Sequence, residues 1–200
     1  MNRRVIAYHA IMTTYGFWLP NDPRGSWSDF VRAWELRRFG PATRVYDRRS
    51  YARDPHDARL RLEAKKHLAR RAVEFTGVQA RAVARGFAHY LGKSRVTVYA
   101  CAILPGHVHM VVGRYRYSIE MIANLLKGAA TRELSNENLH PFAHQPYRNG
   151  DLPTPWARKC WSCFLDCDRD IERAMNYVND NPLKERKHAQ HWSFVSAEFR

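Results

Sequence analysis

Alternating and periodic apolar residues along the chain predict a mixture of strands and helices. Residues 5–13 are rich in apolar and aromatic side chains and end in a Thr-Tyr-Gly turn signal, which predicts a first core strand. Residues 95–104 are rich in β-branched side chains, and a Pro-Gly turn joins them to another apolar run over residues 107–114. This pattern predicts a hairpin. A fourth strand is predicted over residues 156–165.

Helical spacing of apolar residues predicts four helices around these strands. Ser118 is expected to cap the third helix, because its hydroxyl can accept a hydrogen bond from a backbone N–H of the first turn. Pro182 is expected to close the fourth helix, since proline lacks the N–H that an interior helical position donates. The predicted helices span residues 57–71, 77–92, 119–133 and 168–181.

The order of these elements indicates a fold of the α+β class. Strand, helices, strand, strand, helix, strand and helix follow one another along the chain. The simplest topology with this order is a ferredoxin-like antiparallel sheet with helices packed on it. We expect the two hairpin strands at the centre of the sheet, where a helix can cover them.

Length and charge fit one domain over residues 1–200 that binds a polyanion. The chain has 45% hydrophobic residues, enough for a sizeable core. Its 33 Lys and Arg against 19 Asp and Glu leave a formal charge of +14, which favours nucleic acid as partner. A membrane surface also attracts cations, but no apolar run is long enough to span a bilayer. We expect a cytoplasmic, nucleoid-associated protein.

An irregular segment over about residues 17–57 interrupts the predicted elements and mixes basic with aromatic residues. Such a mixture suits single-stranded DNA, because cations follow the phosphates while rings stack on the bases. A loop pinned to the core by its tryptophans, with solvated arginines, is an equally good interpretation. Candidate DNA contacts are Trp27, Arg32, Trp34, Arg37 and Arg38 in this segment, and Lys127 on the third helix.

His107 and His109 stand two residues apart in a predicted strand. Side chains at this spacing point to the same face of a sheet, so the two imidazoles lie side by side. Neutral imidazole is a common ligand of divalent metals, which makes the pair half of a candidate metal site. Two half-buried, hydrogen-bonded histidines would give the same pattern, and the pair alone does not decide between these interpretations.

Tyr177 and Asn181 lie four residues apart on the last predicted helix, beside its apolar stripe. They are therefore neighbours one turn apart. Laid over the sheet, this helix would present an amide oxygen as a third metal ligand and a phenol as a nucleophile. From the residues alone, an ordinary amphipathic tyrosine is favoured for Tyr177, and a C-terminal helix cap remains open for Asn181.

Four cysteines offer a second candidate centre. Three of them form a C-x2-C-x3-C cluster, a spacing that can indicate a metal or an iron–sulfur site. The surrounding apolar, strand-like residues favour small buried hydrophobes instead, because no fourth nearby ligand completes a zinc set. The cysteines are Cys101, Cys160, Cys163 and Cys167.

Two motifs taken together resemble the single-tyrosine HUH transposases, in particular the REP-associated tyrosine transposases. They are the run Leu-Pro-Gly-His-Val-His-Met-Val-Val over residues 104–112 and the run Tyr-Val-Asn-Asp-Asn-Pro-Leu-Lys over residues 177–184. The resemblance extends over residues 5–194 and is patchy between 17 and 77. It implies a ferredoxin-like fold and single-stranded, hairpin-bearing DNA as substrate. It allows monomers as well as homodimers with shared sites.

The resemblance also implies a role for each site residue. His107, His109 and Asn181 would hold a divalent metal, Mg²⁺ or Mn²⁺, and Tyr177 would attack a DNA phosphate. Cleavage would leave a 5′-phosphotyrosine and a free 3′-hydroxyl, and the reverse attack would rejoin strands without ATP. Two other functions stay open. One is a catalytically silent single-stranded DNA-binding protein on the same fold. The other is a metal phosphohydrolase in which the histidines activate water.

Overall fold

The strands form one antiparallel sheet in the order β2-β3-β1-β4. The computed structural model describes residues 4–19, 31, 34–41 and 57–196. The connection from β1 through α2 to the β2-β3 hairpin, and through α3 to β4, produces the ferredoxin-like arrangement expected from the sequence. The strands are β1 Ala7–Thr13, β2 Val98–Ile103, β3 His107–Gly113 and β4 Trp161–Leu165.

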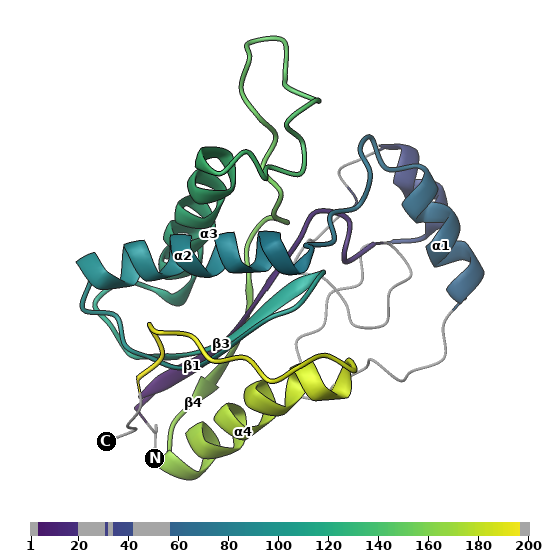
Figure 1. Ribbon diagram of the computed structural model, residues 1–200. Helices are drawn as coiled ribbons and strands as arrows, with labels where there is room; N and C mark the ends of the chain where they lie inside the picture. Colours follow the sequence, from purple (N-terminus) through teal and green to yellow (C-terminus); the bar gives the residue numbers. More distant parts are fainter. Residues whose placement is uncertain (1–3, 20–30, 32–33, 42–56, 197–200) are drawn as a thin grey trace.

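Helices cover both faces of the sheet (Figure 1). The larger core lies between one face and the pair α2 and α3, where Met110 and Phe87 are fully buried. A smaller core lies under α4 on the opposite face and includes Val111 and Val178. The helices are η1 Trp34–Phe39, α1 Ala58–Lys66, α2 Gly77–Lys93, α3 Ile119–Asn136 and α4 Asp168–Lys184.

Local chemistry explains where α2 and α3 begin and how closely they pack. Thr76 and Gln79 form a reciprocal capping box that satisfies two backbone N–H groups at the start of α2. Ser118 caps α3 through the N–H of Met121, as predicted. The two helices meet at Gly86, where an added Cβ would lie 2.6 Å from the Cα of Ala130. Only glycine permits this backbone approach.

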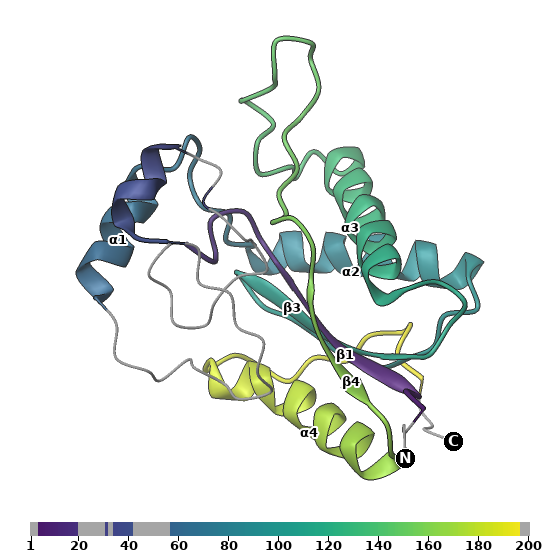
Figure 2. The same ribbon diagram turned by 180° about the vertical axis from the view of Figure 1, so that it is seen from behind.

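The chain that follows α4 runs along the outer edge of β2 (Figures 1 and 2). The side-chain amide of Gln190 accepts a hydrogen bond from the Ile103 N–H and donates one to its carbonyl, both at 2.8 Å. Further along, the Ser196 N–H donates to the Val98 carbonyl at 2.8 Å. These bonds satisfy backbone groups that an edge strand would otherwise leave unpaired.

Four sequence predictions about these elements are wrong in detail. The helix predicted over residues 57–71 ends five residues earlier, since α1 stops at Lys66. Only β3 of the hairpin is central, because β1 pairs with β3 on the side away from β2. β4 starts at Trp161, and Trp156 instead forms an isolated bridge with Thr14 and buries its indole in the larger core. α4 continues through Pro182 to Lys184, since burial of Pro182 compensates for one missing helical hydrogen bond. Among the described residues, no helix is sufficiently long and apolar to cross a bilayer.

Candidate active site

Strands β1 and β3 and helix α4 bring the predicted site residues together on one face of the sheet. His109 and Val111 of β3 point toward α4, while Val108 and Met110 point into the core under α2 and α3. The alternation predicted for this strand is therefore correct. His107 and His109 share a face, with ring centroids 4.8 Å apart and planes at 80°.

The two histidines differ in their surroundings. His109 is 4% exposed and lies under α4. His107 is half-buried at the start of β3, where its ring lies 4.8 Å from the ring of Phe17. The Phe17 ring also packs directly on Gly106 in the hairpin turn, leaving no room for a Cβ there. The turn glycine thus allows an aromatic side chain to cover the outer histidine.

A third histidine, His9 on β1, completes a row with this pair. β1 pairs with β3 so that Ile11 lies opposite His109, which places His9 diagonally beside His109 on the same face. The His9 Nε2 lies 2.9 Å from the His109 Nδ1, at hydrogen-bonding distance. Sequence reasoning missed this residue. Its only signal was alternation with Ala7 and Ile11, which does not reveal the neighbouring strand.

Burial keeps the inner histidines neutral near pH 7. Loss of solvation lowers the pKa of His9 from 6.5 to about 4. The same effect, assisted by the neighbouring His107 and His9, lowers the pKa of His109 well below 6.5. Neutral imidazole is the form that binds a metal, so no proton has to leave before these nitrogens can act as ligands.

Tyr177 extends from α4 over this row of histidines, and its ring meets the rings of His9 and His109 in edge-type contacts. Its ring centroid is 5.5 Å from that of His109 and 5.7 Å from that of His9. The Lys184 Nζ lies 4.7 Å from the centre of the tyrosine ring, at cation–π distance. Tyr177 remains 45% exposed, so a substrate can reach it from solvent.

Asn181 lies one turn further along α4 and is 7% exposed. Its Nδ2 has no hydrogen-bond partner within the described part of the chain. Because α4 continues to Lys184, Asn181 is not the helix cap considered from the sequence. Glu185 follows after another turn, with its Oε1 3.9 Å from the His107 Nε2. Glu185 was not predicted as a site residue because the helix was expected to close at Pro182, although residues 177, 181 and 185 share one helix face.

These side chains match a divalent cation in donor type. The two imidazoles share one face of the sheet, Asn181 lies on α4 one turn from Tyr177, and the carboxylate of Glu185 adds a hard oxygen beside His107. A cation would take the side-chain oxygen of Asn181, because the amide nitrogen is a donor and cannot act as a ligand. These histidine and carboxylate donors do not form a compact site in the structure. Among the described residues, no three of their ligand atoms lie within 4.8 Å of one another.

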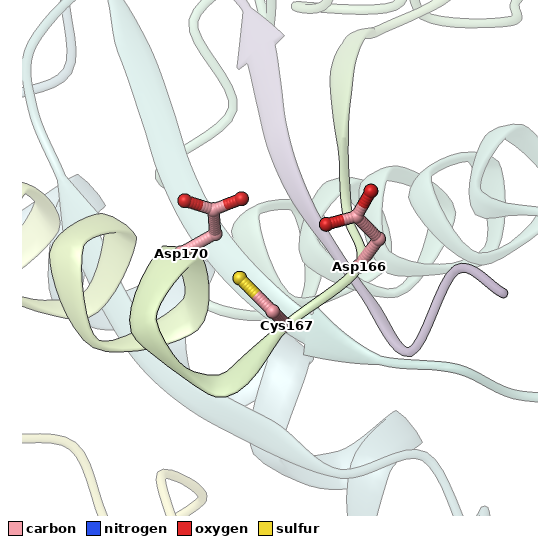
Figure 3. Close-up of side chains that lie close together, drawn as sticks. All are labelled: Asp166, Cys167 and Asp170. Carbon is pink, nitrogen blue, oxygen red and sulfur yellow. The ribbon is translucent and has the colours of Figure 1, made fainter. Parts of the chain in front are cut away.

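The one group of three His, Cys, Asp or Glu donors that does close within 4.8 Å in the described residues lies elsewhere. It consists of Asp166, Cys167 and Asp170 at the start of α4 (Figure 3). Acidic residues are stabilised at a helix N-terminus without any metal. All four cysteines are outside disulfides. Cys101 and Cys160 are buried as expected for small hydrophobes, whereas Cys163 and Cys167 are only partly buried, contrary to that expectation.

The predicted DNA contacts fall into three groups. Lys127 is 6% exposed, and its ammonium donates hydrogen bonds to the carbonyls of Ala157, at 2.9 Å, and of Lys159. Burial lowers its pKa to about 8. Lys127 therefore holds the loop before β4 and is not available for a phosphate, contrary to the prediction.

The remaining candidates belong to the segment before α1. Trp34 begins η1 and is 75% exposed. Arg37 and Arg38 are exposed on the same short helix, with the Arg38 guanidinium 4.8 Å from the ring of Phe39. Buried Leu36 and Phe39 pack η1 against α1, so the aromatic and basic side chains face outward. Trp27 and Arg32 lie outside the described residues.

Comparison with known proteins gives matches among solved structures. No family model and no curated protein matches the chain. A REP-associated tyrosine transposase, solved bound to a REP hairpin, is 10% identical, with 92% of this chain and 72% of that one covered and a TM-score of 0.47. The "putative transposase" of Deinococcus radiodurans R1 is 16% identical, with 94% of each chain covered and a TM-score of 0.37.

Proposed function

We propose that this chain is a transposase domain, a metal-dependent single-stranded DNA endonuclease and strand transferase with Tyr177 as its nucleophile. One observation carries the proposal. The exposed ring of Tyr177 lies 5.5 Å from that of buried His109, on the face that also holds His107. Asn181, whose side-chain oxygen is a possible ligand, follows one helical turn away and is buried. A nucleophile beside a cluster of metal-type donors is the arrangement that phosphoryl transfer requires.

The reaction is an exchange of one phosphodiester for another. The Tyr177 Oη attacks the phosphorus and loses its proton to solvent, while the bond from phosphorus to the 3′ oxygen breaks. The leaving 3′ oxygen takes up a proton and departs as a hydroxyl, so a 5′-phosphotyrosine remains. Attack by a 3′-hydroxyl on the same phosphorus reverses these steps and joins new strands. Because each step exchanges similar ester bonds, no external energy source is needed.

The chain's own residues supply the geometry for this exchange. His107, His109 and Asn181 would hold the cation, either Mg²⁺ or Mn²⁺, with Glu185 beside His107. Bound there, a divalent cation polarises the phosphoryl oxygens and neutralises their developing charge. Lys184, 4.7 Å from the Tyr177 ring, adds a positive charge next to the nucleophile.

DNA binding is proposed to use the basic and aromatic residues outside this face. The formal charge of +14 favours a polyanion, and Trp34, Arg37 and Arg38 point outward from η1. We propose single-stranded DNA with a hairpin as the substrate. This choice rests on the sequence resemblance and agrees with the hairpin bound by the REP-associated transposase named above.

The decisive experiment is to trap the covalent intermediate. The full chain is incubated with hairpin-bearing single-stranded oligonucleotides and Mn²⁺, then denatured and resolved by size. We expect a denaturation-resistant protein–DNA adduct that disappears in Tyr177→Phe. Tyr147→Phe is the matched control, since Tyr147 is 50% exposed but belongs to the loop between α3 and β4.

The two alternative functions give different results in the same assay. Cleavage that survives Tyr177→Phe would indicate a phosphohydrolase that activates water. Binding without cleavage, in the presence of Mg²⁺ or Mn²⁺, would indicate a catalytically silent DNA-binding protein. His107→Ala and His109→Ala are expected to abolish the adduct while retaining most DNA affinity, because phosphate contacts by Lys and Arg dominate binding.

A further inference from the structure

His9 is the one member of the histidine row without a role in the proposed reaction. It lies on β1, half-buried, with its ring 6.3 Å from that of Trp161 and 5.7 Å from that of Tyr177. Its neighbours on this face of β1 and β3 include apolar Ala7 and Val111. A polar ring in such surroundings is costly unless it is paired, and its Nε2 pairs with the His109 Nδ1 at 2.9 Å.

The distance between these two nitrogens restricts where the protons can be. Two N–H groups cannot face each other at 2.9 Å, and two lone pairs would repel, so the contact contains one hydrogen. Either His9 donates it to His109, or His109 donates it to His9. If His109 binds a metal through its other nitrogen, Nε2 must carry the lone pair. The hydrogen then belongs to Nδ1 of His109, and His9 is the acceptor.

We infer that His9 is a positioning residue that holds His109 in the Nδ1–H tautomer, with Nε2 directed at the cation; this inference rests on the proposed function. Metal-ligating histidines usually donate their second ring N–H to a carboxylate, a carbonyl or water, which fixes both the tautomer and the ring orientation. Here a second imidazole takes that place. An uncharged acceptor orients His109 without burying a negative charge under α4.

The arrangement also explains why β1 belongs to the site. Tyr177 contacts His9 and His109 at nearly equal distances, 5.7 and 5.5 Å between ring centroids. The ring of His9 therefore supports the nucleophile's ring and orients the ligand beneath it at the same time. Replacing the acceptor while keeping the volume should disturb His109 first, because its Nδ1–H would lose the His9 nitrogen as a partner in a buried position.

The test compares His9→Phe with His9→Gln in the full chain. Phenylalanine keeps a ring but accepts no hydrogen bond, whereas glutamine can place an amide oxygen near the position of Nε2. Ring ¹⁵N NMR at pH 7.5 without metal reads the tautomer of His109, and calorimetric titration with Mn²⁺ reads affinity. His144→Phe is the control, because His144 is an exposed histidine in the loop after α3.

We expect the Nδ1–H tautomer of His109 in the unmodified chain and in His9→Gln, and a mixture of tautomers in His9→Phe. Mn²⁺ affinity should fall about tenfold or more in His9→Phe, recover most of that loss in His9→Gln and stay unchanged in His144→Phe. The inferred role of His9 is refuted if His109 carries its hydrogen on Nε2 in the unmodified chain. It is also overturned if His9→Phe keeps tautomer and affinity, or if glutamine loses as much Mn²⁺ affinity as phenylalanine.

This experiment fails separately from the proposed function. The tautomer is measured without metal or DNA, so the inferred role of His9 is tested independently of any adduct on Tyr177. If His9→Phe does not fold, the tautomer in the unmodified chain still decides. An Nδ1–H tautomer together with no covalent adduct would contradict the transposase chemistry while leaving the His9 contact in place.

Discussion

Acid should destabilise the metal-free chain through His9 at pH values where most proteins remain stable. The folded state lowers the pKa of His9 from 6.5 to about 4 by burial. Between these values the unfolded chain binds a proton that the folded chain does not bind. The free energy of unfolding therefore has its full value above pH 6.5 and falls as the pH drops toward 4.

The expected loss follows from the size of the shift. The pKa changes from 6.5 to about 4, and each pKa unit corresponds to about 1.4 kcal/mol, so His9 accounts for about 3 kcal/mol by pH 4. His109 adds to the loss in the same direction, since its pKa is also lowered by burial. For a domain with a total of about 5–15 kcal/mol, this is a large fraction of the stability.

Urea unfolding measures the effect directly. The free energy of unfolding is determined with EDTA at intervals from pH 7.5 to 4, following tryptophan fluorescence. In His9→Gln the decline should be shallower by about 3 kcal/mol over this range, since glutamine does not titrate. Parallel curves for the two proteins would refute the reasoning, because they would show that His9 titrates alike in the folded and unfolded chains.

Three further outcomes are expected. In urea unfolding, Gly86→Ala should lower the free energy of unfolding by about 1–3 kcal/mol through the 2.6 Å clash with α3, whereas Gly128→Ala, whose nearest contact would be 3.6 Å away, should raise it by about 1 kcal/mol. Lys127→Met should lower the melting temperature, while the slope of log affinity for DNA against log salt stays constant; a phosphate contact would instead reduce the slope by about 0.7. Gln190→Ala should speed amide hydrogen exchange at Ile103 without changing exchange in β1.

Local patterns predicted the fold well because they are written in short stretches of sequence. The hydroxyl of Ser118 and the apolar period behind it identified the start of α3. The Pro-Gly turn identified the hairpin that begins β3 at His107. The predicted end of α4 was wrong for a different reason. Pro182 is tolerated inside the helix because it is buried against the protein, and burial depends on tertiary contacts that no local rule contains.

The candidate site shows the same division. That His107 and His109 share a face follows from strand geometry, so it could be predicted. That His9 lies beside His109 depends on the pairing of β1 with β3 across a hundred residues of sequence. Lys127 was wrongly predicted to contact DNA because a lysine on a helix is usually solvent-exposed. Only the fold places two backbone carbonyls within hydrogen-bonding distance of its ammonium.

The tail along β2 has a consequence for how the nucleophile can move. Helix α4 starts directly after β4, one outer strand of the sheet, and the residues after it are bonded to β2, the other outer strand. The helix that carries Tyr177 is thus connected to both outer strands of the sheet. Placing Tyr177 in the site of a second chain would require the hydrogen bonds between Gln190 and Ile103 to break. Cleavage should accordingly follow first-order kinetics, with a rate per molecule that does not depend on protein concentration.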